Sequence, residues 1–374
     1  MSVNKFIVHI AAEFVKAVNN NFEDNYDYNR YGELLLSKRK KLKIKQKAVK
    51  KVNELGFFNN FNNTLFANKI KDIEFPFGDF FYLYDILEDD YSKELLVKII
   101  AYRILGHTKV KLPLSTPAFW NDQKRIESHQ HKDDFTKVGF MDLMLPLTDL
   151  SFMGVPIKIY YSSLGINIDF VIKQYELHRD GVVIRADAGD VVLDCGGCFG
   201  DTALYFANLV GGKGKVKTFE FIPNNIQVFN KNIGINPALA TIIELVSNPV
   251  WKESGKEVFF LDNGPASRVS LDFFEAYTGK TTTLTIDDFV DSSGLKKVDF
   301  IKMDIEGSET NALKGATETI KKFRPKLAIA VYHSSEDFDS IPRFIDSLGA
   351  GYKFYLSHAT IYGEETMLFA KAAK

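Results

Sequence analysis

The sequence predicts an α/β protein in which one mostly parallel sheet carries helices on both faces. From residue 181 onward, short apolar segments alternate with amphipathic segments of helical period. This alternation indicates βαβ units, whose parallel strands are buried on both faces. The last two apolar segments, 352–358 and 366–372, instead have the spacing of a hairpin, so we expect the final strand to run antiparallel at the sheet edge.

The elements of this half follow one another in a regular order. Strands are predicted over 189–197, 215–221, 240–248, 298–307 and 326–333. Helices are predicted over 201–210, 224–236 and 338–349. Open parallel sheets bind ligands beyond the carboxyl ends of their strands, so we expect the site at that edge.

The first half of the chain has a different pattern. Residues 89–106 and the N-terminal segment carry apolar residues at helical spacing, which predicts a mainly helical module. Prolines and short apolar runs follow, and 155–163 and 166–177 predict a hairpin joined near Gly165. We expect three domains. They are a helical module (1–110), a connector with short strands that borders the substrate (111–180) and a ligand-binding domain (181–374).

Two polar segments of the first half admit a functional interpretation. The run 37–51 holds nine basic residues that suit phosphates or an acidic glycan, although such a run is more often a solvated helix face. The segment 127–134 carries side chains of metal-ligating type, but no third ligand is fixed by spacing, so we expect a polar surface loop. Those side chains are His129, His131, Asp133 and Asp134.

Composition excludes several classes of protein. The net charge of −1 gives no global attraction to nucleic acid or anionic membranes. Two cysteines rule out a disulfide framework and fit a reducing compartment. No apolar run approaches the roughly 18 residues that a membrane-spanning helix needs, so we expect a cytoplasmic protein.

A glycine-rich loop follows the first predicted strand of the sheet, in the sequence LDCGGCFGDT. Glycines there allow a tight turn and let a ligand approach the backbone, and the amides of the following helix point at that ligand. The candidate residues of this loop are Asp194, Gly196, Gly197, Cys198, Gly200 and Thr202. Cys195 and Cys198 also form a C-x-x-C pair, but the intervening glycines and the preceding acid make a redox role the weaker alternative.

The acids around the loop narrow the class of ligand. A carboxylate at Asp194 disfavours a pyrophosphate but tolerates a cationic cofactor. Glu220, at the end of the second strand and followed by Phe221, suits the hydroxyls of a ribose. An adenosine cofactor with a positive centre is S-adenosylmethionine, which is therefore the predicted cofactor.

Several stretches, in this order, resemble the FkbM family of class I S-adenosylmethionine-dependent methyltransferases. They lie within residues 174–370 and are GDVVLDCGGCFGDTALYFA, FEFIPNN, TLTIDDFV, VDFIKMDIEGSE, RPKLAIAVYH and YKFYLSH…ETMLFA. The resemblance implies a Rossmann-like fold whose seven-stranded sheet has its last strand antiparallel. It also implies methyl transfer to a hydroxyl of a sugar, glycan or related small molecule, with residues 181–374 as the catalytic domain. The family usually has Glu-Pro after the second strand, where this chain has Glu220-Phe221-Ile222-Pro223.

The chemistry is expected at the ends of the fourth and fifth strands. Asp304 closes the fourth strand, Glu306 and Glu309 follow it, and Lys302 lies within it, where burial predicts an ion pair with one of these acids. His333 closes the fifth strand as a base or a metal-adjacent residue. Asp304, Glu306 and His333 together allow a divalent cation, although no spacing demands one.

Three further residues complete the expected site, and Glu309 has a second expected role. Ser247 and Asn248 end the third strand, where an amide reads the adenine edge or caps a turn before Pro249. We expect His358 and Glu309 to contact the acceptor, which is the molecule that receives the methyl group.

Alternative functions stay open from the sequence. A nucleic-acid or N-directed methyltransferase would use the run 37–51, but the motif MDIEGSE after strand four differs from those of base N-methylation, so nucleic acid is not the expected partner. A non-catalytic scaffold would not need Gly196, Gly200 and Glu220, which are all present. A dehydrogenase is disfavoured by Asp194 and by the antiparallel last strand. A homo-oligomer is compatible with the sequence.

Overall fold

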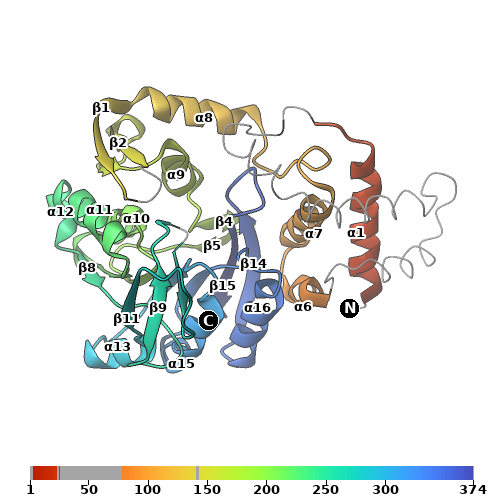
Figure 1. The fold of residues 1–374 in the computed structure, drawn as a ribbon. Coiled ribbons are helices and arrows are strands. Elements are labelled where there is room, and N and C mark those ends of the chain that lie inside the picture. Colours follow the sequence, from red (N-terminus) through yellow and green to blue (C-terminus); the bar gives the residue numbers. More distant parts are fainter. Residues whose placement is uncertain (1–2, 23–24, 26–77, 140–142, 266, 374) are drawn as a thin grey trace.

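The computed structural model describes residues 3–22, 25, 78–139, 143–265 and 267–373. Its centre is a seven-stranded sheet with the strand order β14-β15-β13-β12-β6-β7-β8 (Figure 1). The strands are β6 (Val191–Cys195), β7 (Lys215–Phe219), β8 (Ile243–Val246), β12 (Phe300–Met303), β13 (Lys326–Ala330), β14 (Tyr352–His358) and β15 (Thr366–Ala372).

The sheet is parallel except at its last strand. β15 pairs antiparallel with both β13 and β14. It therefore lies between these two strands, and β14 forms the edge, so the predicted edge position of the last strand is wrong. Hairpin spacing fixes the pairing of β14 with β15, but it does not decide which of the two strands adds to β13.

Helices cover both faces, as predicted. Alternate residues of each strand enter two separate cores: Leu193 of β6 packs with α13–α16, and its neighbour Val192 packs with α10. The helices are α10 (Asp201–Val210), α11 (Pro223–Gly234), α12 (Pro237–Ala240), α13 (Ile286–Ser292), α14 (Glu309–Lys314), α15 (Thr317–Phe323) and α16 (Asp337–Ser347).

The described part of the N-terminal segment is helical, as predicted. Its helices are α1 (Val3–Val18), α6 (Gly78–Ile86) and α7 (Asp90–Leu105). Asp89 caps α7 by accepting the amide of Ser92, and Gly106 ends it. These helices share the core on the α13–α16 face of the sheet, and Leu87 forms a parallel bridge with Phe354 at the edge strand. The basic run 37–51 lies outside the described residues.

The connector differs most from its prediction. Pro117 starts an unpredicted helix, α8 (Pro117–Ser128), because proline is tolerated at the first helical position. The exposed residues that follow form β1 (Gln130–Lys137) instead of a loop, paired with β2 (Met144–Asp149), which also pairs with β3 (Lys158–Tyr160).

The second strand predicted for the connector hairpin is wrong. Ser162 caps a helical turn by accepting the amide of Gly165, so α9 (Ser163–Ile166) begins there and a π-helical turn (Asn167–Ile172) continues it. Ile166, Ile168 and Phe170 are all buried, and a short apolar run of this kind has no period that separates a strand from a buried helix. Only the end of the segment is extended, in β4 (Leu177–Arg179), which pairs with β5 (Val182–Ile184).

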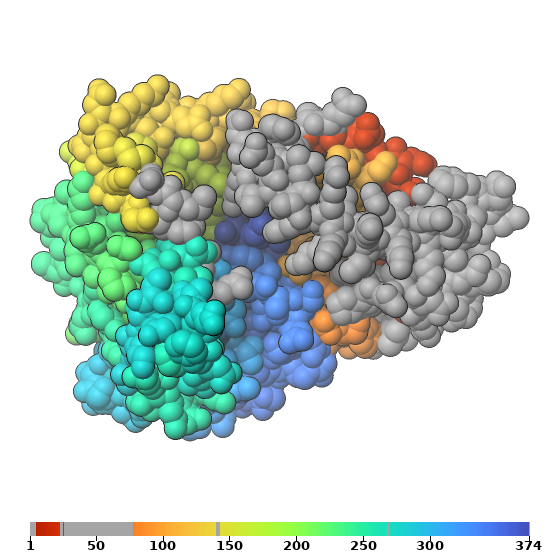
Figure 2. Space-filling model, in the orientation of Figure 1, coloured from red at the N-terminus to blue at the C-terminus, as the bar shows by residue number. Residues whose placement is uncertain are grey.

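A second small sheet follows β8. It has the order β10-β9-β11 and consists of β9 (Glu257–Leu261), β10 (Arg268–Ser270) and β11 (Gly279–Thr282). This sheet was not predicted from the sequence. Figure 2 shows the segment that contains this small sheet, in teal, at the surface of the molecule that faces the viewer.

Candidate active site

The glycine loop takes the close turn that its composition predicts. Gly196 has φ +90°, and a Cβ on it would lie 2.1 Å from the carbonyl oxygen of Asp304. Gly197 also lacks space for a side chain, because a Cβ on it would lie 2.0 Å from Cγ2 of Thr218. The loop thus packs directly on the ends of β12 and β7, and Gly200 stands as the N-cap of α10.

We expect Gly196→Ala to lower the free energy of unfolding by about 2–5 kcal/mol, from left-handed backbone strain plus the clash with Asp304. Gly181→Ala is the matched control, because Gly181 has φ +78° and a Cβ added there would meet no atom within 4 Å. It should cost only about 1–2 kcal/mol. Urea unfolding measures both, and equal losses would contradict the close approach.

Asp194 holds the loop from beneath. It is fully buried and accepts hydrogen bonds from the hydroxyls of Thr202 (3.0 and 2.9 Å) and Thr218 (3.1 Å). Its ion-pair partner is Lys302, at 3.3 Å, which stands beside it in register on the neighbouring strand. The prediction that Lys302 pairs with Asp304, Glu306 or Glu309 is therefore wrong, because the side chain turns toward β6. Lys302 also donates to the carbonyl oxygens of Cys195 and Gly196.

We expect Lys302→Met to cost about 3–5 kcal/mol of stability, because it leaves Asp194 charged and unpaired in the core. The double variant Asp194→Asn/Lys302→Met should regain part of this loss in urea unfolding. If Lys302→Met instead keeps full stability and loses only activity, the lysine takes part in the chemistry.

A cavity lies at the carboxyl ends of β6, β7 and β12, where the strand order switches direction. Among the predicted residues, it is lined by Gly196, Cys198, Glu220, Phe221, Asn248, Asp304 and Glu306. The residues not predicted are Phe219, Ile222, Asn225, Pro249, Val250, Gly264, Pro265, Ser267, Val269, Ile305 and Ser308. Gly264, Pro265 and Ser267 come from the turn between β9 and β10, and Val269 lies in β10. The turn residues Asn263-Gly264-Pro265 were the available signal.

Glu220 is fixed at one end of the cavity. Its Oε1 accepts the amides of Phe221 (2.7 Å) and Ile222 (2.8 Å), and its Oε2 accepts the Asn225 amide at 3.2 Å. Burial raises its pKa to about 7, against the opposing effect of these hydrogen bonds. The carboxylate thus lines the cavity in a preset orientation, which suits a ligand that donates hydrogen bonds.

The two cysteines do not form a disulfide, and burial raises the pKa of both thiols. Protonated thiols are poor nucleophiles, which disfavours a redox pair. Cys198 has φ +40° and lines the cavity, whereas Cys195 is buried in the core.

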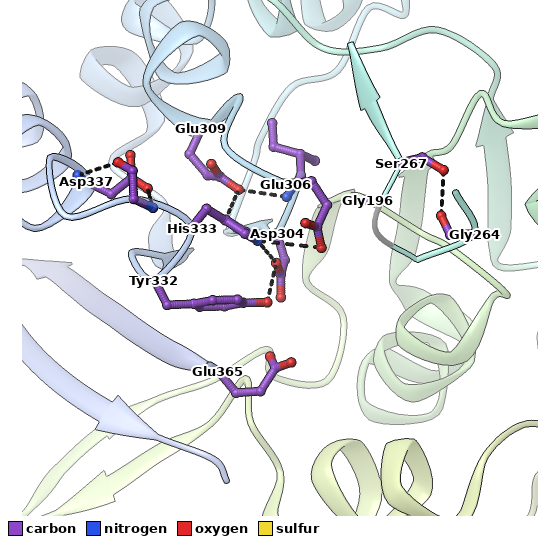
Figure 3. A network of polar contacts seen from close by, with 12 residues as sticks. Gly196, Gly264, Ser267, Asp304, Glu306, Glu309, Tyr332, His333, Asp337 and Glu365 are labelled. Carbon is purple, nitrogen blue, oxygen red and sulfur yellow. Dashed lines mark hydrogen bonds and ion pairs between the residues drawn. The ribbon is translucent and has the colours of Figure 1, made fainter. Parts of the chain in front are cut away.

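A cluster of acids surrounds His333 at the other end of the cavity (Figure 3). Its Nδ1 lies 3.1 Å from Glu309 Oε1, and its Nε2 lies 3.5 Å from Asp304 Oδ1 and 3.6 Å from Glu306 Oε1. These acids raise the pKa of His333 to about 11 against the opposing effect of burial. An imidazolium has no lone pair for a proton, so the arrangement disfavours His333 as the base. Asp304 and Glu306 line the cavity, while Glu309 is fully buried behind them.

Two tyrosines that the sequence analysis did not single out hold Asp304. The hydroxyl of Tyr332 donates to Oδ1 at 3.1 Å, and that of Tyr175 donates to Oδ2 at 3.3 Å. Burial raises the pKa of Asp304. Tyr332 lies just after β13, directly before His333. This position beyond a strand end was the signal in the sequence that could have identified it.

Three expected residues lie away from the cavity or face it differently. His358 is buried in the β14–β15 hairpin, where its nitrogens contact the Thr366 hydroxyl and the Tyr362 carbonyl, and burial lowers its pKa to about 4. Ser247 is exposed and does not line the cavity. Asn248 does, but its amide donates to the carbonyl of Thr282.

The family comparison agrees with this geometry. Residues 194–354 match the family model described as the methyltransferase FkbM domain. This part of the chain is similar to FkbM methyltransferase domains. The match begins at Asp194 of the loop and ends within β14, so it contains both ends of the cavity and every residue of the His333 cluster. The chemistry that the family name states is methyl transfer.

Solved structures of methyltransferases also resemble the chain. The methyltransferase FkbM of Methylobacillus flagellatus KT is 20% identical, with a TM-score of 0.49 over 83% of this chain and 66% of that one. This chain thus spans just under two thirds of that protein. The fibrillarin of Aeropyrum pernix with bound S-adenosyl-L-methionine is 12% identical, with a TM-score of 0.37 over 63% of this chain and 99% of that one.

The O-methyltransferase TomG of Streptomyces achromogenes, in complex with SAM, is 10% identical, with a TM-score of 0.34 over 60% of this chain and 85% of that one. No curated protein is recognisably similar to the chain. The assignment of a Rossmann-like class I methyltransferase fold rests on the strand order and on the antiparallel β15. In the part of the chain that the structure describes, no helix is both long and apolar enough to span a membrane.

Proposed function

We propose that the protein is an S-adenosylmethionine-dependent O-methyltransferase whose acceptor is a sugar, a glycan or a related small molecule. One observation carries the proposal. A single cavity joins Glu220, at the end of β7, to Asp304, at the end of β12, across the backbone of Gly196. A carboxylate for ribose hydroxyls and a carboxylate for the reacting hydroxyl thus face the same space.

The cofactor is proposed to lie along the glycine loop. Glu220 would accept hydrogen bonds from the ribose hydroxyls, and the side chains of Phe221 and Val250 offer apolar surface to the adenine. Gly196 lines the cavity, so the cofactor would pass along its backbone at the strand end. The sulfonium would then lie toward Asp304, where a negative side chain favours a positive centre.

In the proposed methyl transfer, the protein needs mainly to align the acceptor hydroxyl with the methyl group and to remove the hydroxyl proton. The acceptor oxygen attacks the methyl carbon, the carbon–sulfur bond breaks, and S-adenosylhomocysteine leaves as a neutral thioether. The hydroxyl proton passes to a base, and Asp304 is the proposed base. Its raised pKa favours proton uptake, and its two tyrosine partners hold the carboxylate in place.

The polar surroundings of Asp304 support a hydroxyl-rich acceptor. Besides the two tyrosines, Glu365 contributes a half-buried carboxylate that accepts a hydrogen bond from Gln174 at 2.7 Å. Carboxylates, amides and phenols are hydrogen-bonding partners for sugar hydroxyls. The identity of the acceptor rests on the family and on this polarity together.

Transfer of label from radioactive S-adenosylmethionine tests the proposal. The acceptors are a panel of nucleotide sugars and oligosaccharides, with RNA and DNA as competing classes. We expect label on a sugar acceptor, as a methyl ether that survives mild alkali. Label on nucleic acid alone, or on a nitrogen atom, would contradict the proposed acceptor.

A further inference from the structure

We propose that Asp304, Glu309 and His333 form a binding site for one divalent transition-metal ion beside the cavity. Each of the three offers a ligand atom, and these atoms lie within 4.8 Å of one another. Metal–ligand bonds of about 2.0–2.3 Å place ligand atoms at such separations. Glu306 was the second carboxylate expected from the sequence, but the structure groups Glu309 with Asp304 and His333.

Buried atoms without hydrogen-bond partners point independently to a missing ligand. Glu309 is fully buried, and its Oε1 accepts the amide of Ile305 at 2.8 Å, whereas its Oε2 has no partner. The side chain of His333 is 7% exposed, and its ring nitrogens face the acids at 3.1–3.6 Å without hydrogen-bond geometry. A metal ion bound there would take the place of the ring proton. Buried polar atoms are nearly always satisfied, and a cation would satisfy both residues at once.

The charge of the cluster favours a doubly charged ion. Asp304, Glu306 and Glu309 surround one imidazole in a largely buried place, and a single added proton would neutralise only one of three carboxylates. The cation Lys302 is paired with Asp194 instead. A divalent cation supplies the remaining charge and removes the repulsion between the acids.

The donor set selects the type of metal. One imidazole nitrogen with two carboxylates suits Mn²⁺ or Zn²⁺ better than Ca²⁺ or Mg²⁺, which prefer oxygen ligands alone. Asp304 and Glu306 also line the cavity, so a cation held here would adjoin the acceptor hydroxyl and make its proton easier to remove. That role rests on the proposed function, whereas cation binding does not.

Calorimetric titration with Mn²⁺ and Zn²⁺ tests the site without cofactor or acceptor. The full chain, freed of metal with EDTA, should bind one equivalent of at least one of the two ions. Glu309→Gln and His333→Ala should each weaken binding by at least about tenfold, as loss of metal-site residues does. Glu336→Gln is the matched control, because Glu336 is exposed, lies three residues after His333 in the sequence and belongs to no part of the cluster. This variant should bind the ion as the wild type does.

The outcomes separate this proposal from the proposed function. A wild type that binds S-adenosylhomocysteine but neither ion overturns the cation site and leaves methyl transfer standing. Ion binding without S-adenosylhomocysteine binding supports the cation site and contradicts the cofactor. Equal ion binding by Glu309→Gln and Glu336→Gln also overturns the site. Because Glu309→Gln keeps the size of the side chain, it serves as the test if His333→Ala fails to fold.

Discussion

Asp304→Asn is expected to slow methyl transfer by about 10²- to 10⁴-fold, the usual contribution of a general base. The amide keeps the size of the side chain and can still accept one tyrosine hydroxyl, but it cannot take a proton. Asp304 also lines the cavity, yet ribose recognition falls to Glu220, so the affinity for S-adenosylhomocysteine should change little. Single-turnover kinetics with saturating cofactor measure the rate.

Asp299→Asn is the control for this variant. Asp299 precedes the same strand at its opposite end, where its Oδ2 accepts the amide of Val191, and an amide oxygen can keep that bond. Its rate should equal that of the wild type. A small effect of Asp304→Asn, or equal losses in both variants, would mean that another group removes the proton.

Glu220→Gln is expected to weaken S-adenosylhomocysteine binding by about 10- to 100-fold, the value of hydrogen bonds to a charged group. The glutamine oxygen can keep the two backbone amides. Its NH2 group would face the Asn225 amide, which donates to Glu220 in the wild type, so Asn225 must turn over and accept through its Oδ1, which has no partner. The variant should therefore fold. Glu244→Gln makes the same change on the adjacent strand, away from the cavity, and should bind normally.

The raised pKa of Glu220 sets the pH dependence of this binding. Below about pH 7 the carboxyl is protonated in the free protein, so wild-type affinity should rise from pH 6 to pH 8 as the carboxylate forms. The effect of pH on the free energy of unfolding has the opposite sign. The folded pKa exceeds the ordinary 4.5, so the folded state holds the extra proton between about pH 4.5 and 7, and this contribution to stability falls as pH rises through that window. Glu220→Gln should lose both dependences, which calorimetry and urea unfolding at each pH would show.

The parts of the site that follow from local sequence were predicted. The glycine loop, Glu220 and Asp304 each stand at the end of an apolar segment, and parallel strands bring their carboxyl ends to one edge. The positions of the strand ends alone therefore predict the residues on the two sides of the cavity.

What depends on contacts between distant segments was not predicted. Lys302 meets Asp194 because β12 and β6 align these two residues, and only the register between the strands gives that pairing. Tyr175 reaches Asp304 from the connector, where a short apolar run misled the assignment of the preceding turn. The small sheet after β8 supplies a wall of the cavity, but its short strands lack a distinctive period.

Titration of the wild type with S-adenosylhomocysteine tests the central claim most directly. We expect one molecule to bind per chain with micromolar affinity, on the order of −8 kcal/mol, and NAD to show no comparable binding. A folded protein that binds NAD, or that binds no S-adenosylhomocysteine with or without added Mn²⁺ and sugar acceptors, would contradict it.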